Sequence, residues 1–365
     1  MEQEELNHLN YQYTPNEKEA DGIAYVFSNP ESMVRYPFKL PELNPNEIRI
    51  KVNYTGLCHT DVSNMKGEWG QIFYPICPGH EIVGVVSEIG SDVKDFQIGD
   101  RVGYGPQREC CNCCTECEEG RDNCCLGDNL QMETYGDMYW GGYATIVQQP
   151  ADFAFKLPPE LKEETAPPLF CAGLSTYAPI ARYCKPGDQV AVLGIGGLGH
   201  LAVQFAKAMG CKVVAFSGSR EKDELIKELG AERVVTSGDL KALEKEKYSF
   251  SVVLNTVPVF DETVFKGFLG LVKPNGYFVQ IGLPAVDTPL KIDPMLIVSK
   301  QIKLTGSYVG SRKEMKEMLK FAAKHGISPK CEIFEFESFP KAFEKLVSGR
   351  PFFRCVVKCK DYFNK

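Results

Sequence analysis

The stretch QVAVLGIGGLG, residues 189–199, decides the fold class of this 365-residue chain. Its apolar start has the composition of a buried strand, and its end fits the pattern G-x-G-x-x-G. Residues 198–209 continue as a predicted helix that ends at Gly210. A strand that passes through such glycines into a helix is the setting in which a dinucleotide pyrophosphate approaches a helix N-terminus. This setting disfavours the alternative interpretation, a glycine-rich turn that binds no ligand. We therefore expect cofactor contacts from Gly194, Gly196, Gly197, Leu198 and Gly199.

Strands and helices alternate on both sides of this stretch. Helices are predicted at 174–183 and 220–229, and short strands at 212–216, 234–235, 251–255 and 277–281. Alternation of this kind predicts a parallel sheet that is covered by helices.

The residues before and after this region follow a different pattern. From 22 to about 150, apolar and polar residues alternate between Gly, Pro and Asn turns, as at 47–52 and 81–86, which predicts antiparallel β structure. A helix over 313–324 and a β-like segment over 352–358 suggest that the chain returns to this first domain. Two domains also suit a chain of this length.

The end of the second predicted strand distinguishes the two nicotinamide cofactors. A site for NAD usually has Asp or Glu there, which binds the ribose 2′-hydroxyl. This chain instead has hydroxyls and cations around the strand end, at Ser217, Ser219, Arg220 and Lys222. These side chains suit a 2′-phosphate, so we predict NADP(H). In the alternative interpretation, Ser219 only caps the next helix and the cations are solvated.

A run of cysteines predicts a metal site in the first domain. Seven of the fifteen cysteines lie between residues 110 and 125. Within the run, the spacing C-x2-C-x2-C-x7-C suits four thiolates around one Zn²⁺, at Cys111, Cys114, Cys117 and Cys125. An alternative ligand set that starts at Cys110 and Cys113 is conceivable, but it has three residues instead of two before Cys117 and so fits the zinc spacing less well. We expect Cys110, Cys113 and Cys124 to be bystanders that are prone to oxidation.

A second set of soft ligands is scattered along the chain at Cys58, His80 and Cys171. Two thiolates and an imidazole leave the fourth position of a zinc ion open for water or substrate, as a catalytic zinc requires. Each residue is a weak signal alone, because a single Cys is more often a small buried hydrophobe. Together with the four-cysteine loop and the dinucleotide pattern, the combination is specific.

Several motifs carry a resemblance to a known family. They are GLCHTD, PGHEIVG, CAGLSTY and GIGGLGH, followed by Gly306-Ser307. In this order they resemble the zinc-dependent medium-chain alcohol dehydrogenases, and most of all the cinnamyl alcohol dehydrogenase branch of NADP(H)-dependent aldehyde reductases. The resemblance covers nearly all of residues 22–360. It implies an α/β protein with a GroES-like β-rich catalytic domain, residues 1–171 and 309–365, and a Rossmann domain with a doubly wound parallel sheet, residues 172–308.

The resemblance also implies roles for the candidate residues. The catalytic zinc would be held by Cys58, His80 and Cys171, with Glu81 able to approach it and Asp61 as a partner behind the ligands. The structural zinc would be held by the four cysteines of the loop. We further expect Ser175 and Gly282 among the residues that contact the cofactor.

Proton transfer is where the chain departs from its relatives. Thr60 lies two residues after a proposed ligand, and the family passes a proton from such a hydroxyl through the cofactor ribose. Many relatives have a histidine three residues later, whereas this chain has Ser63. Serine can pass a proton but cannot store one near neutral pH. We expect activity with an altered pH dependence.

The predicted reaction is hydride transfer between NADP(H) and a primary alcohol or aldehyde, in a pocket lined by Trp69 and Trp140. Medium-sized or aromatic aldehydes would suit aromatic walls. Tyr74 and Phe170 are equally well explained as core residues. One alternative is a catalytically weak or retired homologue that binds nucleotide and has a structural role. Another is a zinc-free quinone reductase, which the two sets of zinc ligands disfavour.

Composition limits the partners. A net charge of −7 argues against nucleic acid or an anionic membrane, and no apolar run has the ~18 residues of a membrane helix. The N-terminus is acidic and does not resemble a targeting segment. Fifteen cysteines without such a segment indicate a reducing compartment, hence a cytoplasmic protein. The resemblance implies a homodimer.

Overall fold

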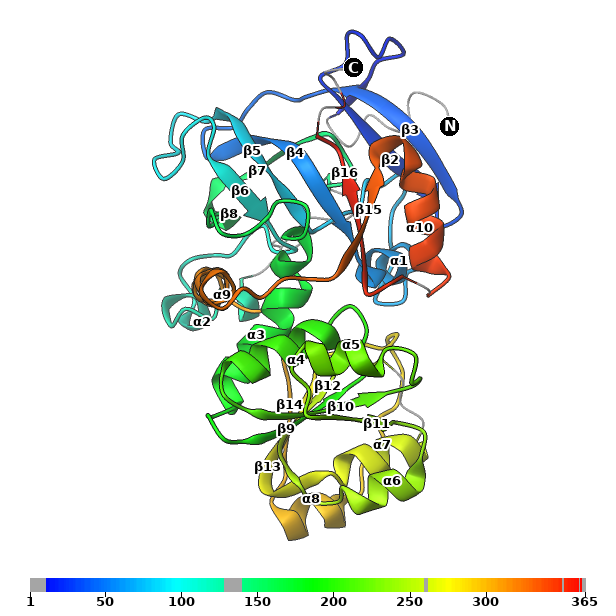
Figure 1. Ribbon diagram of the computed structural model, residues 1–365. Helices are drawn as coiled ribbons and strands as arrows, with labels where there is room; N and C mark the ends of the chain where they lie inside the picture. The colour runs from blue at the N-terminus through cyan, green and yellow to red at the C-terminus, as the bar shows by residue number, and fades with distance from the viewer. Residues whose placement is uncertain (1–10, 128–139, 259–261, 350, 361, 363–365) are drawn as a thin grey trace. The chain divides into compact units, whose positions relative to one another are not determined.

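The computed structural model describes residues 11–127, 140–258, 262–349, 351–360 and 362 (Figure 1). The chain divides into two units. One comprises Met1–Cys171, Ser311–Leu319 and Ser328–Lys365, and the other comprises Ala172–Gly310 and Lys320–Ile327. Among the described residues, no helix combines the length and the apolar character that crossing a membrane requires.

The second unit is built on a six-stranded parallel sheet. In spatial order its strands are β11 (Arg233–Thr236), β10 (Lys212–Ser217), β9 (Gln189–Leu193), β12 (Phe250–Asn255), β13 (Val272–Gln280) and β14 (Lys303–Gly306). The strand–helix alternation predicts a parallel sheet and five of these strands, but not the last one, β14. The order reverses between β9 and β12, and in sheets of this kind dinucleotides bind outside the carboxyl ends of the strands at that point.

Helices cover both faces of this sheet. They are α3 (Ala172–Tyr183), α4 (Gly199–Ala208), α5 (Asp223–Glu228), α6 (Leu240–Lys245), α7 (Glu262–Leu269) and α8 (Pro294–Lys300). Figure 1 shows α4 and α5 on one face and α6 and α8 on the other, which makes the sheet doubly wound. Helix α5 is shorter than predicted, because Arg220 and Lys222 lie in the turn before it.

The first unit contains a larger, mostly antiparallel sheet. Its main path is β15 (Cys331–Glu335), β16 (Arg354–Lys358), β4 (Glu47–Leu57), β5 (Ile82–Ile89), β6 (Arg101–Tyr104) and β8 (Ala154–Lys156), and β7 (Ile146–Pro150) pairs with β4. The C-terminal strand β16 lies antiparallel to β4 with Cys355 opposite Leu57. The chain therefore returns to the first unit, as the sequence suggests.

The remaining elements of the first unit are short. A three-stranded sheet has the order β1 (Gln12–Tyr13), β3 (Ser32–Lys39) and β2 (Gly22–Asn29). The helices are α1 (His59–Met65), α2 (Thr115–Glu118), α10 (Phe339–Val347) and the first part of α9 (Arg312–His325). Because α1 begins directly after β4, a residue at this junction is fixed by both elements.

The glycine turn between β9 and α4 is a tight steric contact. A Cβ atom on Gly199 would lie 1.9 Å from the carbonyl oxygen of Gly194, whereas one on Gly196 would meet no atom of the described residues within 4 Å. The third glycine of the pattern is therefore required by helix–strand packing, whereas the second has open space where a side chain would begin.

We predict that Gly199→Ala destabilises the cofactor-free protein by about 2 kcal/mol, because the methyl group must displace backbone. Gly196→Ala, the matched control, should leave the denaturant midpoint unchanged. Chemical unfolding of both variants, monitored by circular dichroism, measures this difference. Equal midpoints for the two variants would contradict the steric assignment.

Candidate functional site

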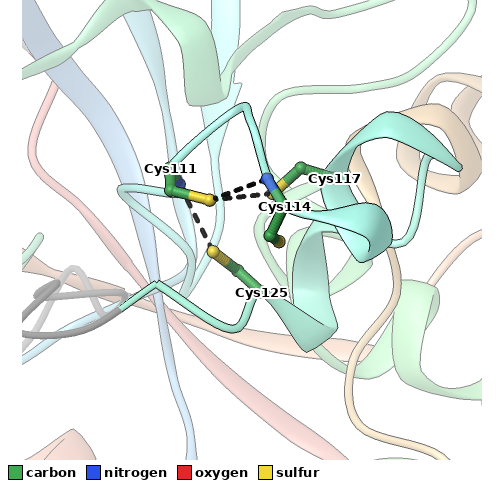
Figure 2. A group of neighbouring side chains, drawn as sticks. All are labelled: Cys111, Cys114, Cys117 and Cys125. Atoms are coloured by element: carbon green, nitrogen blue, oxygen red, sulfur yellow. Dashed lines mark hydrogen bonds between the residues drawn. The ribbon is translucent and has the colours of Figure 1, made fainter.

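Four cysteines of the first unit form a compact group of sulfur atoms. The Sγ atoms of Cys111, Cys114, Cys117 and Cys125 all lie within 4.8 Å of one another (Figure 2). The sulfur atoms of Cys111 and Cys117 are 3.9 Å apart. Such a set has the donor chemistry and the spacing of a closed tetrahedral zinc site, with no position left for a substrate.

Backbone N–H groups favour thiolates in this loop. The sulfur of Cys111 accepts the N–H of Cys114 at 3.3 Å, and the sulfur of Cys125 accepts the N–H groups of Cys111 and Gly127, each at 3.3 Å. Hydrogen bonds from the backbone of Cys113 and Cys114 lower the pKa of Cys111 to about 6. At Cys111 the thiolate form, which binds metal, is thus stabilised in the metal-free chain.

The additional cysteines of the run lie outside this group. The sulfur of Cys110 is 3.1 Å from Oδ1 of Asn112 and 3.2 Å from Nη2 of Arg312. Cys113 and Cys124 are exposed. The alternative register through Cys110 and Cys113 does not correspond to the cluster that the structure forms.

A second group of potential ligands joins residues from three distant segments. Single ligand atoms of Cys58, His80, Glu81 and Cys171 lie within 4.8 Å of one another. Cys58 caps α1 at the end of β4, His80 and Glu81 directly precede β5, and Cys171 ends the turn before α3. The first three are at most 5% exposed. Cys171 is half-buried. Two thiols and an imidazole in one group suit a zinc site that keeps a position open.

Asp61 holds the imidazole from behind. Its Oδ1 lies 2.9 Å from Nδ1 of His80, and both side chains are fully buried. A carboxylate in this place accepts a hydrogen bond from Nδ1–H, so Nε2 keeps its lone pair for a metal. This geometry suits the predicted role of Asp61 as a partner behind the ligands.

Sequence reasoning missed Arg354, which belongs to the same site. Its Nη2 donates to Oε1 of Glu81, and its Nη1 lies 3.9 Å from the sulfur of Cys58. Arg354 begins β16, and the register of β16 with β4 brings it next to Cys58. Arg354 and Glu81 are 273 residues apart in the chain, and no short motif contains both. No local signal in the sequence could therefore have found this pair.

The remaining oxygen of Glu81 fits a cation site. Oε2 is buried and accepts no hydrogen bond from the residues that the structure describes. A Cβ atom on Gly56 would lie 2.1 Å from it, so the glycine in β4 leaves the room that this carboxylate occupies. A buried carboxylate oxygen without a donor is costly unless a cation compensates it, so a metal held by Cys58, His80 and Cys171 suits the residues present.

The groups of this site shift one another's acidity. Burial raises the pKa of Glu81 to about 7, although Arg354 acts in the opposite direction. A hydrogen bond from the Cys171 thiol lowers the pKa of Cys58, assisted by the charges of Arg354 and His80, and the same bond raises the pKa of Cys171. One thiolate is therefore already favoured at Cys58 in the metal-free chain.

Helix α1 also carries the two hydroxyls that the sequence proposes for proton transfer. Thr60 is half-buried and Ser63 is 4% exposed. They lie three residues apart, hence on one face of the helix.

In the second unit, the predicted cofactor residues gather at the carboxyl ends of β9 and β10. These strands are neighbours, with Leu193 opposite Phe216, so the glycine turn after β9 lies beside the serine turn after β10. The hydroxyl of Ser217 donates to the carbonyl of Ser219 at 2.7 Å. Arg220 has a side chain that is 79% exposed and pairs with Asp223. These contacts leave the Arg220 side chain accessible to an anion.

Two further predicted cofactor residues lie in the same unit. Gly282 follows β13, and its N–H donates to the carbonyl of Asn255 at 3.0 Å, at the carboxyl end of β12. Ser175 is a buried residue of α3.

The two tryptophans have different surroundings. Trp140 is 1% exposed and stacks on Tyr11 at 4.3 Å, with Phe38 at 4.7 Å. Trp140 was expected in the substrate pocket, but its ring packs between other aromatic rings of the core. We therefore leave it out of the pocket proposed below. Trp69 is half-buried in the turn after α1. Phe170 is fully buried, as the core interpretation of this residue expects.

Comparison with known proteins identifies the family. Residues 44–159 match the alcohol dehydrogenase GroES-like domain, and residues 197–324 match the zinc-binding dehydrogenase domain. Cinnamyl alcohol dehydrogenase 7 of Arabidopsis thaliana is 38% identical over 93% of this chain and 96% of its own length. The NADP-dependent alcohol dehydrogenase C 1 of Mycolicibacterium smegmatis is 36% identical over 86% of this chain and 91% of its own.

Solved structures agree with this assignment. A cinnamyl alcohol dehydrogenase from Sorghum bicolor superposes with a TM-score of 0.86 at 32% identity, covering 93% of this chain and 97% of that one. A CAD from Helicobacter pylori, complexed with NADP(H), gives a TM-score of 0.84 at 27% identity, covering 93% and 98%. The fold, the two groups of metal-binding side chains and these matches together show that the chain belongs to the zinc-binding alcohol dehydrogenase family.

Proposed function

We propose that this protein is a zinc-dependent oxidoreductase that transfers hydride between NADP(H) and a primary alcohol or aldehyde. The observation that carries the proposal is the group of buried Cys58 and His80 with half-buried Cys171, and the oxygen of Glu81 beside it. Its donor set suits a zinc ion with one exchangeable position, whereas the four-cysteine group suits a closed one. When bound there, zinc supplies Lewis-acid polarisation of the substrate oxygen, and NADPH supplies the hydride.

The chain's own residues hold and balance this site. Cys58 and Cys171 provide negative charge, and His80 provides a neutral ligand whose orientation depends on Asp61. Arg354 binds one oxygen of Glu81 and so fixes the direction of that carboxylate. Thr60 is the proposed proton donor to the product oxygen, and Ser63 passes the proton onward.

We assign NADP(H) rather than NAD(H) as the cofactor. Ser217, Ser219, Arg220 and Lys222 surround the end of β10, where a site for NAD would have a carboxylate. The guanidinium of Arg220 is accessible, and its present partner is a carboxylate three residues away that a phosphate could replace. Relatives whose names include NADP dependence support this choice.

The proposed substrates are medium-sized or aromatic aldehydes, with Trp69 as one wall of the pocket. Relatives named cinnamyl alcohol dehydrogenase support an aromatic substrate, and a relative from Petroselinum crispum named mannitol dehydrogenase adds a polyol to the candidates. A reduced NADP pool would favour reduction of the aldehyde.

We also propose a homodimer that works in the cytoplasm. Strand β14 ends the strand order of the second unit's sheet. Large apolar side chains of α8 and of the segment after β13 are more than half exposed, namely Leu283, Val286, Met295 and Val298. Pairing of two copies at this edge would cover them. None of the fifteen cysteines, all of which lie within the described residues, forms a disulfide, which suits a reducing compartment.

The zinc-loaded enzyme is expected to oxidise NADPH in the presence of aldehydes and to contain two zinc ions per chain. Cys58→Ser should lose one zinc and reduce kcat/KM by at least about 10³-fold, because the substrate oxygen is no longer polarised. Cys113→Ser, which removes an exposed cysteine outside both groups, is the matched control and should keep both zincs and full activity.

An NADPH-absorbance assay with aliphatic, aromatic and sugar aldehydes, together with metal analysis of each variant, measures both quantities. No turnover of any aldehyde by the chain with two zincs, or full activity of Cys58→Ser, would refute the proposed function.

Ser217→Asp should reverse the cofactor preference. A carboxylate at the end of β10 repels the 2′-phosphate and accepts a hydrogen bond from a ribose 2′-hydroxyl, so kcat/KM should fall by about 10²-fold with NADPH and rise with NADH. Ser217→Ala is the control, with a small loss for NADPH and no gain for NADH. Steady-state kinetics with both cofactors tests this, and an unchanged ratio would argue against the site.

Ser63→His should introduce a proton-storing group into α1. We expect the pH profile of kcat/KM to gain an inflection near the ordinary imidazole pKa of about 6.5. Ser63→Ala, which has no group to titrate, should not gain it. Profiles of all three proteins that coincide would place Ser63 outside proton transfer.

A further inference from the structure

Tyr143 reaches the metal-binding group from a segment that the motifs do not contain. It lies in the chain just before β7 and is fully buried. Its hydroxyl donates to Oδ2 of Asp61 at 2.7 Å. Asp61 in turn accepts a hydrogen bond from His80, a proposed zinc ligand. Tyr143 is therefore linked to this ligand through Asp61.

The carboxylate of Asp61 accepts four hydrogen bonds, two at each oxygen. Oδ1 accepts from the N–H of Gly79 at 3.1 Å and from Nδ1 of His80 at 2.9 Å. Oδ2 accepts from the N–H of Cys58 at 3.2 Å and from the hydroxyl of Tyr143 at 2.7 Å. Three of the donors therefore belong to ligands or to the residue beside one, and Tyr143 supplies the fourth and shortest bond.

Packing leaves the tyrosine ring little freedom to move. Its edge meets the ring of Phe339 at 4.8 Å between centroids. On another side, a Cβ atom on Gly79 would lie only 2.6 Å from Cδ1 of Tyr143, so the ring sits directly against the backbone before His80. The backbone N–H of Tyr143 also donates to the carbonyl of Pro78 at 2.9 Å. The hydroxyl is therefore a donor whose position is set by the core.

Protonation keeps the tyrosine in the donor state. Burial, and next the charge of Asp61, raise the pKa of Tyr143 well above its ordinary value. The hydroxyl therefore retains its proton across the neutral range. A fully buried carboxylate also depends on such donors, because an unsatisfied charged oxygen costs several kcal/mol.

We propose that Tyr143 is a positioning residue of the open zinc site, which fixes Asp61 and through it the orientation and tautomer of His80. The inference rests on the proposed function in that it takes Cys58, His80 and Cys171 as the zinc ligands. Without the hydroxyl, Oδ2 keeps only the longer bond to the N–H of Cys58, and the carboxylate can turn away from Nδ1. The imidazole then loses the restraint that aims Nε2 at the metal.

Tyr143→Phe removes the hydroxyl and leaves the ring in place. The matched control is Tyr104→Phe, because the Tyr104 hydroxyl is also fully buried in the first unit but has no hydrogen-bond partner within the described part of the chain. Each variant is loaded with zinc and dialysed against a chelator, and the rate of loss of each of the two zincs is measured. We expect one zinc to leave Tyr143→Phe about tenfold faster than the wild type, which is the lower end of the loss seen when a hydrogen-bond partner of a metal ligand is removed. The rates of zinc loss from Tyr104→Phe should equal those of the wild type.

Cobalt substitution gives a readout that general destabilisation does not move. With Co²⁺ at the open site, the visible absorption bands should differ between Tyr143→Phe and the wild type, because the geometry of the imidazole ligand changes. The bands of Tyr104→Phe should coincide with those of the wild type. Neither measurement needs turnover, so a chain that reduces no aldehyde would refute the proposed function and still allow this inference to be tested.

A double-mutant comparison tests the route through Asp61. In an Asp61→Asn background, where the charged acceptor is gone, adding Tyr143→Phe should change zinc loss by less than about twofold. The proposal is overturned if Tyr143→Phe retains zinc and its cobalt spectrum like the wild type. It is also overturned if the tyrosine change has the same effect with and without Asp61.

Discussion

Strand β4 runs from Glu47 to Leu57 through the first unit's larger sheet, and its pairing with β16 is the contact on which the open metal-binding group depends. Cys58 follows β4 directly, and Arg354 begins β16. The antiparallel register sets the guanidinium beside the sulfur of Cys58 and the carboxylate of Glu81. A slip of one residue would turn Arg354 to the other face of the sheet and leave buried negative charge without a partner.

Charge balance explains why this group is so densely connected. Two thiols, an imidazole and a carboxylate come together where water is scarce, and such groups are stable only with compensation. Arg354 compensates Glu81, and the donors around Asp61, including Tyr143, compensate that carboxylate. The cysteine loop needs fewer compensating side chains, because backbone N–H groups donate hydrogen bonds to its sulfur atoms. A zinc ion bound there would also be enclosed by four sulfurs. One group is therefore suited to exchange a ligand and the other to brace a loop.

Local patterns carried most of the fold prediction. The parallel sheet and five of its six strands follow from apolar strands that alternate with helices, whereas β14 was not predicted. The glycine turn lies where its spacing predicts, because strand, turn and helix are adjacent in the chain. The four-cysteine group could also be predicted, since all its ligands lie within fifteen residues. Boundaries were less accurate, as at α5, where helix propensity did not reveal that the turn after β10 extends to Lys222.

The sequence by itself determined the two-domain α/β architecture, the family resemblance and the candidate ligands, because each depends on short-range spacing or on motifs. Only the tertiary structure decided that Arg354 and Tyr143 support these ligands and that Trp140 belongs to the aromatic core. These contacts join residues far apart in the chain, such as Tyr143 and Asp61, which are 82 positions apart. Their partners are chosen by strand register and side-chain packing, which leave no periodic or local trace in the sequence.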